Sequence, residues 1–376
     1  MKISLAVALL CLVVSCRHQK YKSDNWYFDD ESAAYVKSGT TDTDASKIML
    51  RLSGIKHGMP FYKGYAYVIN TEGKLGVIDE KGNWKTTPLF ENTNRYCDGI
   101  FDTRYDSTMI AVQVGGKWGY ANHKGEIVIE PIYDIAYGFA HESPHSLVGI
   151  VNTSGQMCIG VIDRKGDYVI VPQPLHYGIE VYSKPVKADS GLQPKQLGDK
   201  WGFATADGTI KIAATHDEVG PFVCGFAPVR TGDNWTYINS DGKLSYSRHE
   251  VCKAFPFDQS GKAAVMMPEG NKYYIETIVG EDEWGEVIVQ VDTINELFVE
   301  CGFINRACTK ANVHEENFMG FYLPNSYVAF LIAYDDGVIL FVPNEKEATM
   351  CGAWSAHGEK ETFGVGGQPT LMDIDY

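Results

Sequence analysis

The sequence predicts an all-β fold: an array of β-meander repeats, either propeller-like or an open solenoid, followed by a β-rich C-terminal domain. Three observations support this prediction. Turn glycines recur at steps of 43, 41, 42 and 34 residues, strand-forming runs flank each glycine, and apolar residues show no helical spacing. The glycines are Gly82, Gly125, Gly166, Gly208 and Gly242.

Each glycine ends a four-residue turn of hairpin type. The first turn residue is an Asx or a Thr, as in Asn122-His123-Lys124-Gly125. An Asx side chain can accept hydrogen bonds from the backbone two residues on, and glycine readily adopts the positive φ that such turns need. The turns therefore predict one hairpin per repeat.

The strands are expected on both sides of each turn, with one more upstream. In the second copy the expected strands are Ala111-Val112, Trp118-Gly119-Tyr120 and Ile127-Val128-Ile129. The stretch from Lys184 to Gly198 contains two prolines and three lysines, and it reads as an extended loop between the third and fourth copies.

The Trp-Gly pairs predict a packing device. A tryptophan supplies a large apolar anchor, and the glycine after it leaves room for another backbone to come close. An exposed ring that stacks on sugars or bases is the rival interpretation, and recurrence at one repeat position favours packing. The residues concerned are Trp118, Gly119, Trp201, Gly202 and Trp235.

These units resemble the WG repeat, also called the KWG repeat. The copy from Lys117-Trp118-Gly119-Tyr120 to Pro131 follows that family's pattern almost throughout, whereas Ala213-Ala214 replaces the proline in the fourth copy and Thr236 replaces the glycine in the fifth. The resemblance covers roughly residues 58–280 and five to six units. It implies a β-rich repeat module and brings no shared catalytic residues.

The N-terminus resembles a bacterial lipoprotein signal peptide. A short apolar run ends at Val13-Val14-Ser15-Cys16, and it is too short to span a bilayer as a mature helix. Residues 1–15 are therefore expected to be removed and Cys16 to be lipidated. Residue 17 is Arg and not Asp, and this favours sorting of the lipoprotein to the outer membrane. The protein would then face the periplasm or the exterior.

The rest of the chain divides into a polar tether at 16–50, the repeat domain at 51–280 and an acidic domain at 281–376. Residues 271–376 hold 18 Asp and Glu against 5 Lys and Arg, so they carry −13 of the total charge of −15. Strands are expected there at 287–289, 327–332 and 338–342, whereas 293–301 fits a strand or a short helix. The chain has no basic stripe for nucleic acid.

The sequence gives little support for a catalytic or metal site. His141-Glu142-Ser143-Pro144-His145 matches a zinc-protease pattern, but Pro144 would disrupt the helix that this pattern requires. Cys97, Cys158, Cys224 and Cys252 lie singly in different repeats, which favours buried free thiols. Cys301 and Cys308, followed by His314, fit a disulfide or part of a metal site, but their spacing is unspecific. Acidic clusters at 281–286, 315–316 and 335–336 read as a solvated face, with calcium as the alternative. We therefore expect no catalytic residue, no metal and no cofactor.

The sequence therefore predicts a lipid-anchored cell-envelope protein in which the repeat array is a non-catalytic binding or scaffold module for a protein or a glycan. The membrane would be contacted through the lipid alone. The alternative is an envelope hydrolase with its active site in the acidic C-terminal domain.

Overall fold

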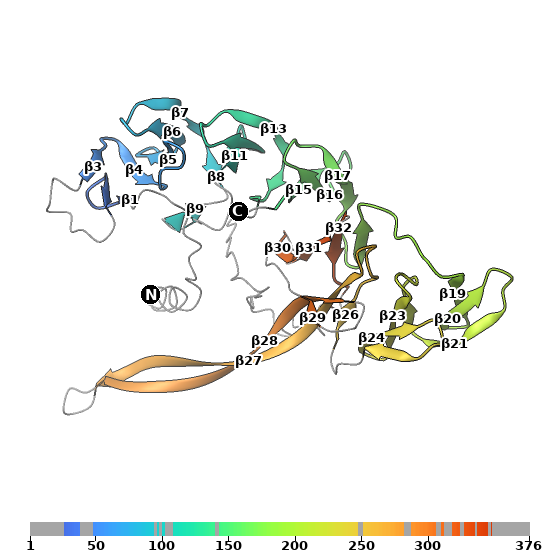
Figure 1. Cartoon of the computed structure of the whole chain (residues 1–376). Coiled ribbons are helices and arrows are strands. Elements are labelled where there is room, and N and C mark those ends of the chain that lie inside the picture. The colour runs from blue at the N-terminus through green and yellow to red at the C-terminus, as the bar shows by residue number, and fades with distance from the viewer. Residues whose placement is uncertain are drawn as a thin grey trace. The chain divides into compact units, whose positions relative to one another are not determined.

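The computed structural model describes residues 26–37, 48–93, 96–97, 100–101, 108–139, 143–246, 251–281, 287–305, 310–311, 318–323, 327–334, 337–344 and 347. All the elements of regular secondary structure in this part of the chain are β-strands, and all of its sheets are antiparallel (Figure 1). The chain forms two compact units, residues 1–175 and 176–376. The predicted all-β repeat array is therefore confirmed.

In the part of the first unit that the structure describes, three meander sheets follow one another in chain order. A three-stranded sheet precedes them, and a two-stranded pair lies within the same stretch of chain. The strands are β1 (Trp26–Asp29), β2 (Ala34–Lys37) and β3 (Ile48–Arg51); β4 (Ile55–Gly58), β5 (Tyr65–Asn70), β6 (Leu75–Asp79) and β7 (Trp84–Phe90); β8 (Asn92–Thr93), β11 (Met109–Val114), β12 (Lys117–Asn122) and β13 (Ile127–Tyr133); β9 (Tyr96–Cys97) and β10 (Ile100–Phe101); β14 (Ile135–Ala136), β15 (His145–Val151), β16 (Met157–Asp163) and β17 (Tyr168–Pro174).

The described residues of the second unit form four sheets, and one of these sheets joins strands far apart in the sequence. That sheet has the order β18-β32-β31-β30. Its strands are β18 (Ile179–Tyr182), β30 (Phe318–Tyr322), β31 (Val328–Tyr334) and β32 (Gly337–Val342); the other sheets contain β19 (Leu192–Leu197), β20 (Lys200–Thr205) and β21 (Ile210–His216); β22 (Glu218–Val219), β23 (Phe226–Thr231), β24 (Asn234–Asn239) and β25 (Leu244–Tyr246); β26 (Lys253–Ala254), β27 (Lys262–Glu281), β28 (Val287–Asn305) and β29 (Lys310–Ala311).

The repeat turns have the expected geometry. Asn122 Oδ1 accepts hydrogen bonds from the N–H groups of Lys124 and Glu126 at 2.9 and 3.1 Å, and Gly125 has a φ of +82°. An Asx side chain makes the same two bonds in the turns that begin at Asp79, Asp163 and Asn239. All five turn glycines have positive φ. The turn chemistry therefore fixes the hairpin in each repeat.

The glycine of the Trp-Gly pair lies where another backbone comes close. A β-carbon on Gly119 would be 2.5 Å from Ile129 O and 2.7 Å from Pro131 N, both on β13. At Gly202 the corresponding distance to Ile212 O is 2.3 Å. The pairing of β12 with β13 shifts register beside Gly119, and this irregularity brings the outer strand inward. No side chain fits at these two positions.

The residue after this glycine, not the tryptophan, is the enclosed core aromatic. Tyr120 and Phe203 are fully buried, whereas Trp118 and Trp201 are half-buried. The tryptophan is the second residue of its strand, so it packs at the rim of the sheet. In the fifth copy Trp235 is itself buried. Trp118 packs against the buried cluster of its repeat, and in the second and fourth copies the fully buried aromatic residue lies two positions after the tryptophan.

The predicted loop from Lys184 to Gly198 is wrong in its second half. Residues Leu192–Leu197 form β19, the edge strand of a three-stranded sheet, and Pro194 pairs with Phe203 on β20. The side chains of β19 after Leu192 are exposed. An exposed edge strand needs no apolar alternation and tolerates a proline, so it resembled a loop.

The C-terminal strands are confirmed. Residues 328–334 and 337–342 form the expected hairpin, and the stretch 293–301, which fits either a strand or a helix by sequence, belongs to β28. β27 and β28 pair along their length across residue 281, the expected domain boundary, and the domain division stays a prediction. The acidic clusters at 282–286, 315–316 and 335–336 lie outside the described residues, as do Cys16, His141, Glu142, Cys308 and His314.

Candidate functional site

Consecutive repeats of the first unit contact one another through their turn glycines. A β-carbon on Gly125 would lie 2.4 Å from Thr86 Oγ1 and 2.7 Å from Val77 Cγ2, in the preceding sheet. Thr86 Oγ1 also donates a hydrogen bond to Lys124 O at 3.1 Å. The next turn glycine, Gly166, is similarly close to Ile129. Each turn therefore contacts the outer strand of the repeat before it.

A carboxylate directly after the outer strands β13 and β21 also joins neighbouring sheets. Asp134 binds Lys117 of its own sheet and accepts a hydrogen bond from Val151 N, at the end of β15, at 2.8 Å. Burial opposes ionisation of Asp134, but these two partners outweigh burial and lower its pKa. In the second unit Lys200 donates to Asp217 at 2.6 Å, and this bond is the largest cause of the lowered pKa of Asp217.

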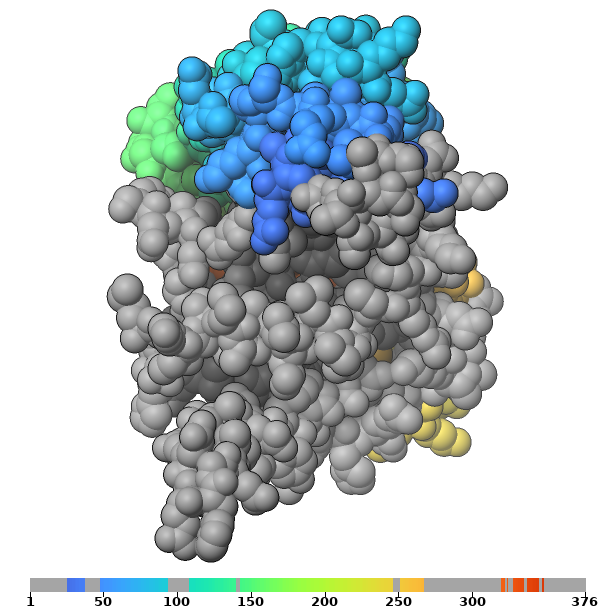
Figure 2. Space-filling view, turned by 90° about the vertical axis from the view of Figure 1, so that its left-hand side faces the viewer, coloured from blue at the N-terminus to red at the C-terminus, as the bar shows by residue number. Residues whose placement is uncertain are grey.

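The outer strands of the first unit expose large apolar side chains. β7, β13 and β17 each lie at an edge of a meander sheet, and Figure 1 shows them following one another along the unit. Their exposed apolar residues range from 36% exposure at Ile127 to 63% at Val171. We call this set the outer-strand surface: Trp84, Leu89, Ile127, Val128, Ile132, Tyr168 and Val171. In Figure 2 the described residues of this unit form one body, coloured from blue to green.

The outer-strand surface follows from the repeat itself. The residue two positions after each turn glycine is large and apolar in all five copies, and all five of these side chains are exposed: Trp84, Ile127, Tyr168, Ile210 and Leu244. Read as sequence alone, such residues counted only as strand formers. Their fixed distance from the glycine was the signal that they form a repeated surface position.

Prolines limit how this surface is used. Pro88, Pro131 and Pro172 lie on β7, β13 and β17, six residues after the turn glycine of each copy. A proline has no N–H to donate, so an edge strand that contains one is a poor template for adding another strand. The surface is therefore suited to contacts through apolar side chains.

The described residues contain no candidate metal centre, since no group of three or more His, Cys, Asp or Glu is placed to hold an ion. His145 is the first residue of a strand, so the zinc-protease pattern is not helical at its described end. Burial lowers the pKa of His145. Cys158 and Cys224 are free, but Cys252 forms a disulfide, so the free-thiol expectation is wrong for Cys252.

A buried lysine forms a structural centre in the second unit. Lys253 Nζ lies 2.8 Å from Glu180 Oε2 and 3.0 Å from Glu347 Oε1. It also lies 5.0 to 5.5 Å from the centroids of three rings, those of Trp235, Phe255 and Phe341. Burial opposes the charge on Lys253, but the two carboxylates outweigh burial and raise its pKa. This side chain ties together three segments that are distant in sequence.

Comparison with known proteins identifies the repeat. The family described as "WG containing repeat" matches residues 76–118, 118–143 and 201–235. These matches cover the first, second and fourth copies. The structure shows that residues 145–174 form the same meander, although Ile159 replaces the tryptophan.

Likeness to solved structures is slight. BamB from Moraxella catarrhalis has a TM-score of 0.19 and 11% identity, over 75% of this chain and 80% of that one. The WD40 β-propeller domain of Doa1 has a TM-score of 0.18 and 11% identity, over 78% of this chain and 94% of that one. These scores are too low to support an argument about this chain.

No curated protein shows significant similarity to the sequence. Within the described residues no helix has the length and apolarity to cross a membrane. The repeated Trp-Gly strands, the turn glycines and the three family matches agree in register along the chain. The chain therefore carries WG-containing repeats in these stretches.

Proposed function

We propose that this protein is a non-catalytic binding or scaffold protein of the bacterial cell envelope, and that its first unit binds a protein partner through the outer-strand surface. The observation that carries the proposal is the run of exposed apolar side chains on three successive outer strands. Exposed apolar patches mark interaction sites in soluble domains. Five of the seven side chains are aliphatic, which suits a protein partner better than a glycan because sugars stack on aromatic rings.

Site-specific crosslinking in cells tests the surface. A photoreactive residue at Ile132 or Val171, which are 56% and 63% exposed, should give a discrete crosslinked protein. The same residue at Glu72 or Ser154, exposed positions in turns of the same unit, should not. Equal crosslinking at all four positions would contradict the proposal, as would none at the first two.

A double variant completes this test. Ile132→Glu with Val171→Glu should leave the melting temperature nearly unchanged, because both side chains are already exposed. Crosslinking from a photoreactive residue at the neighbouring Val128 should disappear in this variant. Persistence of the adduct would show that the outer-strand surface is not the binding site.

The anchor is a separate part of the proposal and rests on the run Val13-Val14-Ser15-Cys16. Cys16→Ser should release the protein from the membrane fraction or leave it unprocessed. Metabolic labelling with a fatty-acid analogue should mark the wild type and not the variant. A variant that remains processed and membrane-bound would rule out lipidation at Cys16.

A further inference from the structure

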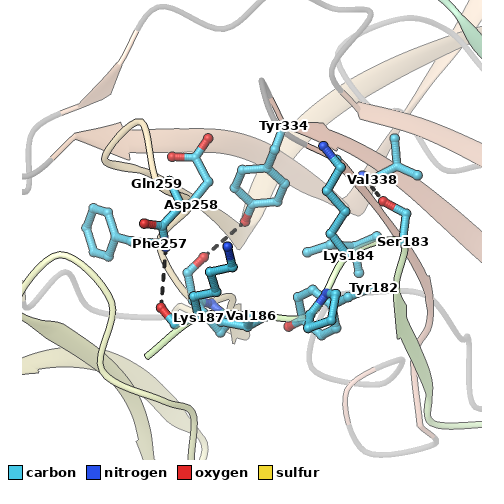
Figure 3. Close-up of a pocket in the computed structure, with 14 residues that line it drawn as sticks. Tyr182, Ser183, Lys184, Val186, Lys187, Phe257, Asp258, Gln259, Tyr334 and Val338 are labelled. Atoms are coloured by element: carbon cyan, nitrogen blue, oxygen red, sulfur yellow. Dashed lines mark hydrogen bonds between the residues drawn. The ribbon is translucent and has the colours of Figure 1, made fainter. Parts of the chain in front are cut away.

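The second unit contains a cavity of about 420 Å³ that is separate from the outer-strand surface (Figure 3). Three segments form its wall: residues 182–187 after β18, residues 256–259 before β27, and the facing ends of β31 and β32. A volume of this size accommodates a small organic molecule.

The wall of this cavity is largely apolar. Tyr182, Phe257 and Tyr334 contribute aromatic rings, and Val338 and Ile339 contribute aliphatic surface from β32. Tyr182 and Tyr334 are half-buried, so their rings are accessible from the cavity, whereas Phe257, Val338 and Ile339 are at most 2% exposed and support the wall from behind its accessible surface. The cavity therefore offers a body of apolar atoms against which a flat or aliphatic group can pack.

The polar groups of the wall are engaged within the protein. Tyr334 Oη accepts a hydrogen bond from Ala264 N at 3.0 Å, and Ser183 Oγ accepts one from Val338 N at 2.9 Å. Asp258 Oδ1 accepts from Lys262 N at 2.8 Å. These bonds fix the wall, so the cavity is formed before any ligand binds.

Two cations remain beside this apolar wall. Lys184 and Lys187 line the cavity, their residues are exposed, and neither forms an ion pair with another described residue. Pro185 lies between them and restricts the backbone. Asp335 and Asp336, which follow Tyr334 in the chain, lie outside the described residues.

We infer that this cavity binds a small organic carboxylate with an aromatic or aliphatic body. The carboxylate pairs with the ammonium groups of Lys184 and Lys187, and the body packs against the rings of Tyr182 and Tyr334. A charge-assisted pair next to an apolar wall is stronger than the same pair in open water. This binding site goes beyond the proposed function, since it lies in the other unit and involves a different class of ligand.

Calorimetry on the full chain tests the inference with 4-phenylbutyrate and indole-3-acetate. Each carboxylate should bind saturably, and its neutral amide should bind at least about tenfold more weakly, because the amide lacks the charge. Affinity for the carboxylates should also fall as salt is raised. Equal affinity of amide and carboxylate would overturn the inference, and so would no binding of either acid.

Matched lysine variants locate the site. Lys184→Gln with Lys187→Gln should weaken carboxylate binding about tenfold without changing the melting temperature. Lys195→Gln, an exposed lysine on β19 that does not line the cavity, should bind like the wild type. The Ile132→Glu, Val171→Glu variant should also retain full affinity, so failure at one site is distinguishable from failure at the other. Equal affinity in all three variants would overturn the inference.

Discussion

The second and fourth copies share their internal architecture and differ in what surrounds them. In both copies the glycine after the tryptophan leaves room for the close approach of the outer strand, and the aromatic residue that follows it is fully buried. In both copies a lysine also forms an ion pair with a carboxylate. Gly125 contacts the preceding outer strand, whereas a β-carbon on Gly208 would meet nothing within 4 Å. The repeat motif therefore specifies the meander, and stacking between repeats is specified separately.

Other features of the chain also change between the third and fourth copies. The two compact units divide at residues 175 and 176, and the long stretch from Lys184 to Gly198 follows. Stacking contacts reappear at Gly242, where a β-carbon would lie 3.4 Å from Ile212 Cγ2. Matching variants in the second and fourth copies test two points: whether the internal features of the two copies are equivalent, and whether the contact made by the turn glycine differs between them.

The largest effect is expected at the buried aromatic residues. Tyr120→Ala and Phe203→Ala should each lower the free energy of unfolding by about 3 to 5 kcal/mol, because both rings are fully enclosed. Trp118→Ala and Trp201→Ala should cost less, since these rings are half-buried. Urea denaturation measures all four. A tryptophan variant that costs more than its tyrosine or phenylalanine counterpart would contradict this view of the core.

The next effect concerns the glycines after the tryptophans. Gly119→Ala and Gly202→Ala should each cost about 3 kcal/mol, because the new methyl group meets backbone atoms that have no free space. Gly191→Ala is the control, since a β-carbon there meets nothing within 4 Å and its φ is not positive. Similar melting temperatures for Gly119→Ala and the control would contradict the close approach.

A smaller difference in stability is expected between alanine variants of the two turn glycines, Gly125 and Gly208. Gly125 and Gly208 have φ values of +82° and +89°, so alanine strains both turns alike. Only Gly125→Ala adds a clash with Thr86 and Val77, and it should be more destabilising by about 1 to 2 kcal/mol. Equal loss of stability in the two variants would show that turn stacking contributes nothing.

The smallest effect is expected at the lysine–aspartate pairs. The pKa values of Asp134 and Asp217 are lower in the folded chain, so their contribution is present above about pH 4 and is lost as pH falls through the folded pKa. Asp134→Asn should cost less than about 1 kcal/mol at pH 7. Asp134→Asn and Asp217→Asn should each flatten the stability profile below pH 4, measured by denaturation at several pH values. An unchanged acid slope in either variant would count against its pair.

Local features could be predicted from the sequence because neighbouring residues determine them. The turn at Asn122 to Gly125 and the space left by Gly119 both follow from backbone chemistry. The edge strand containing Pro194 was missed because it is exposed and needs no apolar pattern. The cavity was missed because Tyr182, Phe257 and Tyr334 are far apart in sequence, and no periodicity connects them.

The pairing of β18 with β32 has a consequence for the order in which the second unit can fold. Val338 donates to Ser183 across 155 residues, so β18 emerges long before its partner strand exists. Until β32 is available, the chain carries β18 without its partner strand. Chaperones that bind unpaired strands therefore have a defined window in which to act on this protein.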